Sequence, residues 1–331
     1  MKKINIIGGN GFIGTRLVGR LKKHDGCSVK IIDKAPSGTF PDIAEMGDVR
    51  SIEQLSRTIE NDSVIVYLAA EHRDDVHPRE LYDQVNVQGA ANLCAVAEQK
   101  NVRKIIFTSS VAVYGFAPIG ADGVCAINPF NDYGRTKYLA EEVFKAWQAK
   151  EPEVRELVII RPTVVFGERN RGNVYNLLKQ IASGRFLMVG RGLNRKSIAY
   201  VENVVAFIEY CLDLGHGVHV FNYADKPDLN MNELVRKINE TLGKKAALGL
   251  RIPYGVGLCI GMLFDGLASL TRRKFAISAI RVKKFCSDSV YSSAVERTGF
   301  KPPVALSDAL CNTIRYEFME DHTGETLFYS E

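Results

Sequence analysis

The sequence predicts an α/β protein in which a doubly wound parallel sheet is followed by a smaller, mostly helical C-terminal lobe. Short apolar runs alternate with helical patterns through the first half of the chain, which is typical of strand–helix–strand units. The apolar runs are rich in Ile and Val with little polar alternation, as in strands that helices cover on both faces. A length of 331 residues suits about two domains, which we place at 1–162 and 163–331.

The first half contains five strand-like runs with helical patterns between them. The predicted strands are Ile4–Ile7, Val29–Ile32, Val64–Leu68, Lys104–Thr108 and Leu157–Ile160. The predicted helices are Gly11–Lys23, Ile52–Glu60, Pro78–Lys100 and Tyr133–Lys150. This order favours a parallel sheet.

The second half is organised differently. A loop rich in Arg, Gly and Asn covers Gly167–Asn173, and helical patterns follow at Val174–Ser183 and Val201–Leu214. The apolar run at Val218–Asn222 is expected to return to the first sheet as a strand. We therefore expect the chain to cross back between the two lobes.

Charge and cysteine content exclude several classes of protein. The net charge is +5, and the Lys and Arg residues form no sustained stripe with interleaved aromatic residues, so no nucleic-acid partner is expected. The seven cysteines are scattered without a CxxC pair, so we expect neither a metal site nor a disulfide scaffold. Isolated thiols fit a reducing compartment, and Gly8 and Gly9 interrupt the first apolar run too early for a signal sequence. We expect a cytoplasmic location.

One apolar segment, Ile252–Leu270, carries a single charge, Asp265. Its length approaches that of a membrane-spanning helix, but Pro253 and four glycines interrupt it. We expect a buried or ligand-covering helix here rather than membrane contact.

A glycine-rich turn follows the first strand and opens the first helix. Gly8, Gly11 and Gly14 form the G-x-x-G-x-x-G pattern with which a backbone approaches a pyrophosphate at a helix N-terminus. Asp33 ends the second strand, nineteen residues after Gly14, where a carboxylate can bind a ribose diol. The turn and the acid together predict a Rossmann-type dinucleotide site with NAD as cofactor. Lys34 could accept a 2′-phosphate, so NADP stays open.

Three side chains suggest an oxidoreductase centre. Tyr133 and Lys137 lie four residues apart on a predicted helix, which puts them on one face. A nearby ammonium lowers the pKa of a phenol and lets it act as a base. Ser110 follows the strand Lys104–Thr108, at the sheet edge where parallel sheets bind ligands, and its hydroxyl could bond a substrate oxygen.

At this point the sequence resembles the extended short-chain dehydrogenase/reductases, specifically the NAD-dependent epimerase/dehydratase group that acts on nucleotide sugars. The motifs that carry the resemblance extend over nearly the whole chain: Gly8–Gly14, Gly47–Arg50, Tyr67–Ala70, Asn86–Leu93, Thr108–Gly115, Tyr133–Lys137 and Arg161–Gly167.

The resemblance implies roles for named residues. Tyr133 would be the general base or acid, and Ser110 would bind the reacting oxygen beside it. The cofactor contacts would come from Gly8, Gly11, Phe12, Ile13, Gly14, Asp33, Asp48, Val49, Leu68, Ala69, Ala70, Tyr133, Lys137 and Pro162. The substrate would be held by Ser110, Asn176, Lys196 and Arg281, with Lys196 standing where the family usually has arginine. A homodimer through the helices at 78–100 and 133–150 is also implied.

The family catalyses several reactions, and the residues after Ser110 exclude one of them. Dehydratases of this family carry an Asp-Glu pair where this chain has Val111 and Ala112, which cannot move a proton. Two reactions remain: a 4-epimerase acting at C4 of a UDP-hexose or UDP-N-acetylhexosamine, and a 4-keto reductase of a UDP-2-acetamido-2,6-dideoxy-4-keto-hexose in surface polysaccharide synthesis. A hydroxysteroid-type dehydrogenase and a non-catalytic NAD(P)-binding protein are further alternatives.

Overall fold

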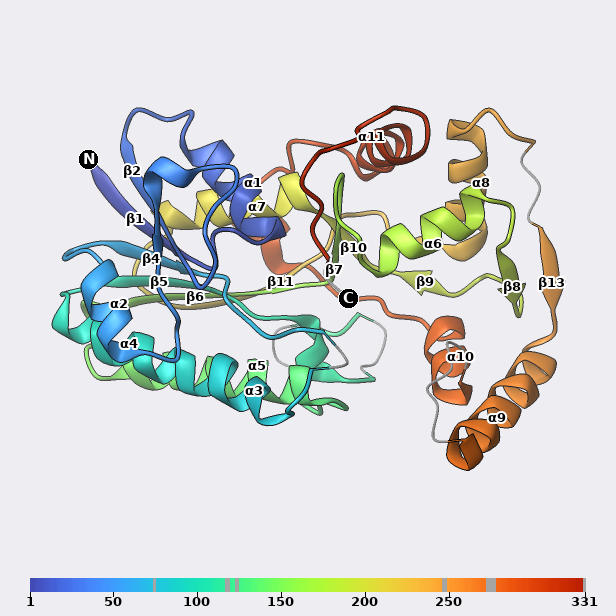
Figure 1. The fold of residues 1–331 in the computed structure, drawn as a ribbon, viewed down its shortest axis with the longest axis horizontal. Coiled ribbons are helices and arrows are strands. Elements are labelled where there is room, and N and C mark those ends of the chain that lie inside the picture. The colour runs from blue at the N-terminus through green and yellow to red at the C-terminus, as the bar shows by residue number, and fades with distance from the viewer. Residues whose placement is uncertain (74–75, 117–119, 123–124, 246–248, 272–277, 330–331) are drawn as a thin grey trace.

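A seven-stranded parallel sheet forms the larger part of the molecule (Figure 1). The computed structural model describes residues 1–73, 76–116, 120–122, 125–245, 249–271 and 278–329. The sheet order is β11-β6-β5-β4-β1-β2-β3. Its strands are β1 (Lys2–Ile7), β2 (Cys27–Asp33), β3 (Ala44–Met46), β4 (Val64–Tyr67), β5 (Lys104–Thr108), β6 (Glu156–Pro162) and β11 (Gly217–Tyr223). The predicted doubly wound fold is confirmed.

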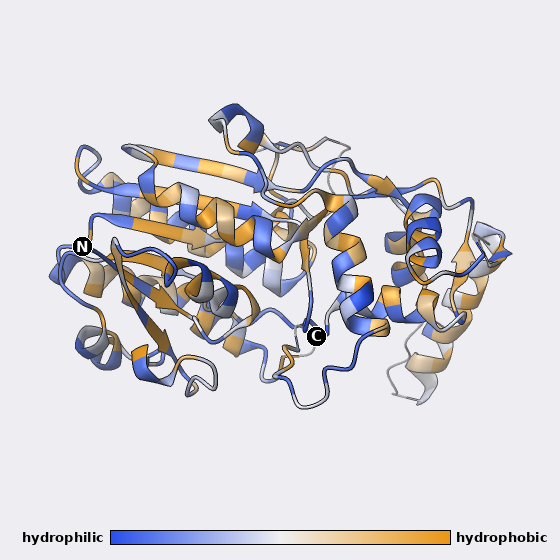
Figure 2. Cartoon of the chain, turned by 90° about the horizontal axis from the view of Figure 1, so that it is seen from above, coloured by the Kyte–Doolittle hydropathy of each residue, from blue (hydrophilic) through white to orange (hydrophobic). Residues whose placement is uncertain are grey.

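Helices cover both faces of this sheet. In Figure 1, α1 (Phe12–Leu21) and α7 (Val201–Tyr210) lie above it. Below it lie α2 (Ile52–Thr58), α4 (Gly89–Gln99) and α5 (Asp132–Ala149). Alternate strand residues point to the two sides: Ile106 of β5 belongs to the cluster above, whereas Ile105 and Phe107 belong to the cluster below. Figure 2 shows the resulting apolar strands between the helices.

Most predicted elements of the first half are confirmed to within two residues at each end. The exception is Pro78–Lys100, where α3 (Glu80–Tyr82) leads through a π-helical stretch, Asp83–Gln88, into α4. The buried side chain of Asn86 lies in that stretch and bonds both the backbone of Glu71 and the hydroxyl of Thr136. The strand predicted at Val218–Asn222 does return to the sheet, as β11 beside β6.

The second lobe is less purely helical than predicted. Its helices are α6 (Asn173–Ala182), α8 (Met231–Thr241), α9 (Tyr254–Thr271), α10 (Ala279–Cys286) and α11 (Leu306–Phe318). Three two-stranded ribbons join them: β7 (Val164–Phe166) with β10 (Ile198–Tyr200), β8 (Leu187–Val189) with β13 (Leu250–Ile252), and β9 (Arg195–Lys196) with β12 (Leu229–Asn230). Strands of two or three residues are too short to give a clear alternation pattern.

The apolar segment at 252–270 lies largely in α9. Of the two expectations for it, a buried helix is wrong, and a ligand-covering helix stays a prediction. Met262 and Leu263 are more than half exposed, and Val256 and Leu267 nearly so. Two of its glycines, Gly257 and Gly261, are buried against the protein instead, whereas Gly255 and Gly266 are exposed. Within the part of the chain that the structure describes, no helix is both long and apolar enough to cross a membrane.

Candidate active site

The predicted cofactor residues gather at one edge of the sheet. Asp33, Thr108 and Pro162 end β2, β5 and β6, and the glycine-rich turn follows β1 at the same edge. Parallel sheets bind ligands at the carboxyl ends of their strands. The structure therefore brings together, at or beside this edge, the predicted cofactor residues Gly8, Gly11, Phe12, Ile13, Gly14, Asp33, Asp48, Val49, Leu68, Ala69, Ala70 and Pro162.

The turn after β1 is packed so closely that only glycine fits at two of its positions. Gly8 has φ +81°, and a Cβ atom there would lie 2.6 Å from the backbone nitrogen of Ala69. A Cβ atom on Gly14 would lie 2.6 Å from the Cα of Gly9. Gly11 is the N-cap of α1, so the free amides of the first helical turn face the space beyond the turn. This is a cradle for a pyrophosphate.

Asp33 is held in place beside the turn. Its carboxylate accepts hydrogen bonds from the backbone nitrogens of Asn10 (3.0 Å) and Ala35 (3.1 Å). Lys34 forms a 2.8 Å ion pair with Glu71, so its charge is partly compensated. The fixed carboxylate favours a ribose diol over a 2′-phosphate.

Several buried polar atoms at this edge have no hydrogen-bond partner among the described residues. They are Asn10 Oδ1, Thr108 Oγ1 and Thr163 Oγ1. Buried polar groups in native proteins are nearly always paired, so such atoms indicate a polar ligand that completes the site. Together with the glycine cradle and Asp33, they fit a dinucleotide.

Asp48 and Val49 lie beyond the edge strand β3. The Arg50 guanidinium binds the Asp48 carboxylate at 2.6 Å and holds the pKa of that carboxyl below its usual value. Val49 is buried, and its carbonyl accepts a 3.0 Å hydrogen bond from Asn92. Sequence reasoning did not predict the ion pair between Arg50 and Asp48. The spacing of two residues between these opposite charges is the signal that could have indicated this pair.

The predicted catalytic residues Ser110 and Tyr133 lie together where α5 meets the turn after β5. Ser110 caps a short 3₁₀ turn by accepting a hydrogen bond from the nitrogen of Ala112 (3.1 Å). A Cβ atom on Gly134 would lie 2.4 Å from the carbonyl oxygen of Ala112, so glycine lets α5 approach this turn. Tyr133 and Ser110 are joined by a side-chain hydrogen bond, which lowers the pKa of the phenol, whereas burial raises it by more.

Lys137 lies one helical turn after Tyr133 and is 2% exposed. Its Nζ atom is 4.3 Å from the centre of the Phe107 ring. Burial lowers the pKa of Lys137 to about 7, although the charge of Glu141 opposes this shift. The lysine can therefore exchange a proton near neutral pH.

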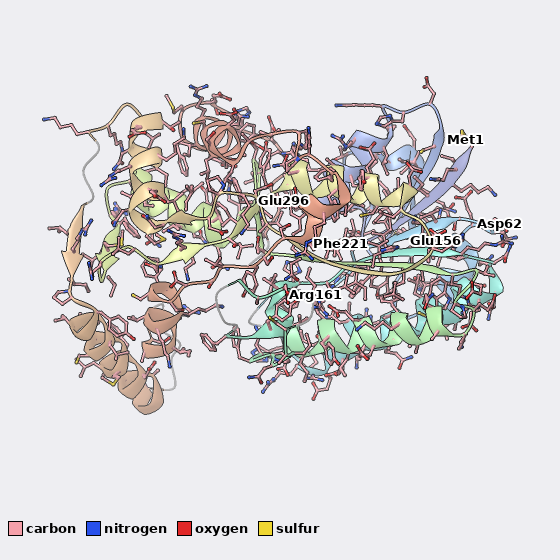
Figure 3. The ribbon with its side chains drawn as sticks, turned by 180° about the vertical axis from the view of Figure 1, so that it is seen from behind. Met1, Asp62, Glu156, Arg161, Phe221 and Glu296 are labelled. Carbon is pink, nitrogen blue, oxygen red and sulfur yellow. The ribbon has the colours of Figure 1, made fainter. Side chains whose placement is uncertain are left out.

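Behind these residues lies a buried network that the sequence did not reveal. Arg161 (Figure 3) donates two hydrogen bonds to Glu141, at 2.9 and 2.5 Å, and a third to the hydroxyl of Tyr114 at 2.6 Å. Glu141 also accepts a 2.5 Å bond from Ser109, next to Ser110. The network links β6, α5 and the turn after β5, and so holds together the elements that carry Ser110, Tyr133 and Lys137.

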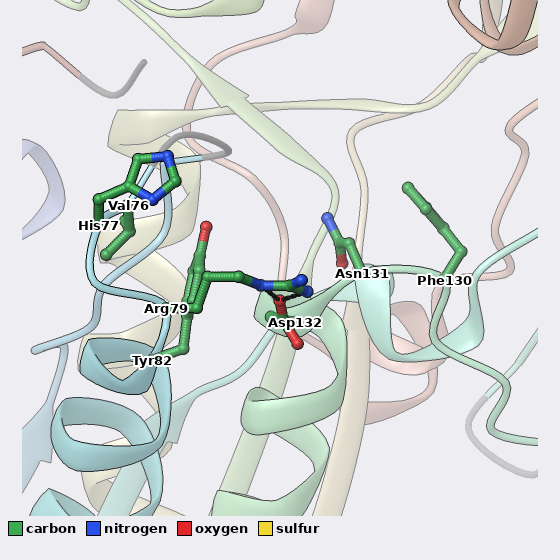
Figure 4. A pocket seen from close by; sticks show the side chains of 7 residues that line it. All are labelled: Val76, His77, Arg79, Tyr82, Phe130, Asn131 and Asp132. Carbon is green, nitrogen blue, oxygen red and sulfur yellow. Dashed lines mark hydrogen bonds and ion pairs between the residues drawn. The ribbon is translucent and has the colours of Figure 1, made fainter. Parts of the chain in front are cut away.

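A pocket of about 270 Å³ opens beside the N-terminus of α5, directly before Tyr133 (Figure 4). One wall carries the ion pair between Arg79 and Asp132. Phe130 forms part of the opposite side, and its ring lies 4.9 Å from Nζ of Lys284 in the second lobe. The second lobe therefore contacts a residue of this pocket, three positions before Tyr133 in the chain.

The predicted substrate residues are placed less uniformly. Lys196 Nζ donates to the carbonyls of Lys284 (2.9 Å) and Ser287 (2.6 Å) at the end of α10, and burial lowers its pKa to about 8. This contact gives Lys196 a structural role. Asn176 lies exposed on α6 and Arg281 exposed on α10. Their roles in substrate binding stay predictions.

Comparison with known proteins agrees with this geometry. The model of the NAD dependent epimerase/dehydratase family matches residues 4–224. The chain is 48% identical over 328 residues to N-acetyl-alpha-D-glucosaminyl-diphospho-ditrans,octacis-undecaprenol 4-epimerase of Escherichia coli O157:H7, covering 98% of each. It is 30% identical over 322 residues to UDP-glucose 4-epimerase of Vibrio cholerae, covering 94% of each.

A solved structure has the same fold. UDP-glucuronic acid 4-epimerase from Bacillus cereus in complex with NAD superposes with a TM-score of 0.72 at 19% identity, over 95% of this chain and 98% of that one. The family match confirms three predictions: the family itself, an enzyme, and NAD as its cofactor. The two relatives also support NAD-dependent epimerisation at C4 of a sugar.

Proposed function

Because this chain belongs to the NAD-dependent epimerase/dehydratase family, we propose that it is a 4-epimerase of an N-acetylhexosamine joined through a diphosphate to a polyprenol. The observation that carries the proposal is the 48% identity to the Escherichia coli enzyme along 98% of both chains. This substrate keeps the C4 chemistry and the diphosphate predicted from the sequence. It replaces the uridine by a lipid.

The residues at the sheet edge would hold NAD. The amides at the start of α1 would bind the pyrophosphate between Gly8, Gly11 and Gly14, and Asp33 would bind the adenosine ribose. Lys137 would hold the nicotinamide ribose. When bound, NAD supplies reversible hydride transfer at C4 of the sugar.

Side chains of the protein transfer the proton to and from the 4-oxygen of the sugar. Tyr133 takes the proton from the 4-hydroxyl as C4 is oxidised and gives it back as C4 is reduced. Ser110 donates a hydrogen bond to the same oxygen. A positive charge on Lys137 stabilises the Tyr133 phenolate and so offsets the burial that raises its pKa. Epimerisation requires that the 4-keto sugar rotate in the site between the two proton transfers, so that C4 is reduced on its opposite face.

Two sets of measurements separate this proposal from its alternatives. The purified protein is denatured and its released NAD quantified, and about one equivalent per chain fits an epimerase, which regenerates its cofactor in place. A second, native sample of the protein is incubated without added cofactor with N-acetylglucosaminyl diphospho-undecaprenol and, in parallel, with UDP-N-acetylglucosamine. The sugars released by mild acid are separated by chromatography.

The proposal predicts formation of the 4-epimer from the lipid-linked substrate and much slower conversion of the nucleotide sugar. Conversion of the nucleotide sugar alone would instead support the UDP-sugar 4-epimerase predicted from the sequence. An empty protein that consumes added NADH or NADPH only with a 4-keto sugar would be a reductase. Tyr133→Phe serves as the inactive control.

A further inference from the structure

Helix α9 turns two of its four glycines toward the protein. Gly257 and Gly261 are buried. A Cβ atom on Gly257 would lie 2.6 Å from a methyl carbon of Val189 in β8, and one on Gly261 would lie 2.7 Å from the backbone nitrogen of Ala279 at the start of α10. These close approaches fix which side of α9 faces inward.

The opposite side of α9 presents its large apolar residues to solvent. Val256, Met262, Leu263 and Leu267 are 49%, 52%, 68% and 47% exposed. Val256, Leu263 and Leu267 recur at helical spacing and form one stripe, and Met262 lies beside it, next to Leu263. Ile280, 54% exposed, lies on α10, which packs against α9. We call these five residues the α9 stripe. A surface helix normally turns its large apolar residues toward the protein and its polar residues toward solvent. Exposed apolar residues along a helix therefore mark an interaction surface.

Most charged residues of this region are cations. Among the described residues of 250–285, four are Lys or Arg and one is an acid, Asp265. Asp265 accepts a 3.0 Å hydrogen bond from the backbone nitrogen of Ala279, so it is used within the protein. On α10, Lys283 is exposed close to the stripe. An apolar helical face with surrounding cations is the composition of helices that lie in the interface of an anionic bilayer.

The α9 stripe is also connected to the catalytic site. Figure 1 shows α9 and α10 side by side at the end of the second lobe, and α9 contacts α10 through Gly261 and Asp265. The far end of α10 is held by Lys196, and Lys284 of α10 reaches the ring of Phe130, three residues before Tyr133. A surface that binds α9 therefore lies one helix away from the contact between α10 and Phe130.

We propose that the α9 stripe inserts into the headgroup region of an anionic phospholipid bilayer and holds the enzyme where a membrane-embedded diphosphate-linked sugar can enter. This proposal rests on the proposed function for its substrate but not for its surface. A second copy of the chain would also cover the stripe, but pairing two such segments would bring together two surfaces with the same positive charge. A membrane with anionic lipids has the complementary charge.

The test is sedimentation of the purified holoenzyme with vesicles, without substrate. Vesicles of phosphatidylcholine alone are compared with vesicles that also contain phosphatidylglycerol. The variant Met262→Glu/Leu263→Glu places two charges in the stripe, and Val154→Glu, an exposed apolar residue after α5, is the matched control. Thermal unfolding midpoints and size-exclusion profiles of all three proteins are recorded.

We expect the wild type and the Val154→Glu control to sediment with the anionic vesicles, and raised salt to weaken this binding. We expect the double variant to lose at least tenfold in the bound fraction at an unchanged unfolding midpoint. A wild type that stays in the supernatant would overturn the proposal. So would a double variant that binds normally, or one that converts a wild-type dimer into a monomer, since the stripe would then be an interface between copies.

Measurements of enzyme activity separate a failure of the membrane proposal from a failure of the proposed function. If the membrane surface is real, the double variant turns over vesicle-embedded substrate at least tenfold more slowly, and a water-soluble short-chain analogue much less so. Vesicle binding without turnover of any lipid-linked sugar would refute the proposed function and leave the membrane surface supported.

Discussion

The buried ion pair between Arg161 and Glu141 yields the sharpest stability prediction. Their side chains are 3% and 0% exposed, and they share two hydrogen bonds. Replacing Arg161 by Met removes the guanidinium while keeping much of its volume. It leaves the Glu141 carboxylate buried with the hydrogen bond from the Ser109 hydroxyl. Removing one partner of such a pair costs about 3–5 kcal/mol, because the remaining charge is buried and unpaired.

Urea denaturation followed by circular dichroism measures this cost as a drop in the free energy of unfolding. A double-mutant cycle with Glu141→Leu isolates the pair. We expect Arg161→Met/Glu141→Leu to lose less than the sum of the single losses, since no unpaired charge remains, with a coupling energy of about 2 kcal/mol or more.

The matched control is Arg135→Met. Arg135 pairs with Asp83 at 2.7 Å, but these side chains are 41% and 50% exposed, so the loss is expected to stay within about 1 kcal/mol. If Arg161→Met costs no more than this control, or if the cycle is additive, then the buried network does not hold β6 and α5 together as described.

Three further predictions concern the site. Tyr133→Phe should lower turnover at least about 100-fold at an unchanged unfolding midpoint, and residual activity near wild type would remove Tyr133 from the proton transfer. Burial lowers the pKa of Lys137 to about 7, so the unfolded chain binds the proton of this lysine more tightly than the folded chain does. The free energy of unfolding should therefore rise between about pH 7 and 10, and Lys137→Met should abolish up to about 1.4 kcal/mol of this rise per pH unit. Parallel curves of unfolding free energy against pH for the two proteins would contradict this prediction. Gly8→Ala places a Cβ atom 2.6 Å from the Ala69 nitrogen at φ +81°, so it should lower the free energy of unfolding by about 1–3 kcal/mol and remove most of the bound NAD. A variant that keeps one equivalent of NAD would contradict the role of this turn in binding the pyrophosphate.

The sequence predicted those parts of the fold that depend on local composition. Ile105–Phe107 has no polar alternation because helices cover both faces of β5, and the run itself shows this. Gly8 and Gly14 are recognisable because a side chain would collide there with the backbone. Tyr133 and Lys137 share a helix, so their spacing was sufficient to place them together.

The parts that sequence reasoning missed depend on contacts between distant segments. Glu141 and Arg161 come from a helix and a strand twenty residues apart, and nothing in either segment marks them as partners. The amine of Lys196 is bound by backbone carbonyls of α10, which any sequence offers. The apolar stretch at 252–270 was misplaced because hydrophobicity shows neither which side of a helix faces the protein nor that Gly257 and Gly261 would form that side.

The central claim is epimerisation of a lipid-linked sugar by a cofactor that stays bound. The most direct test incubates the purified protein, without added nicotinamide cofactor, with N-acetylglucosaminyl diphospho-undecaprenol and follows the released hexosamine by chromatography. We predict an approach to equilibrium between the glucosamine and galactosamine forms with the wild type and none with Tyr133→Phe. A protein that carries one equivalent of NAD but leaves this substrate unchanged would contradict the account.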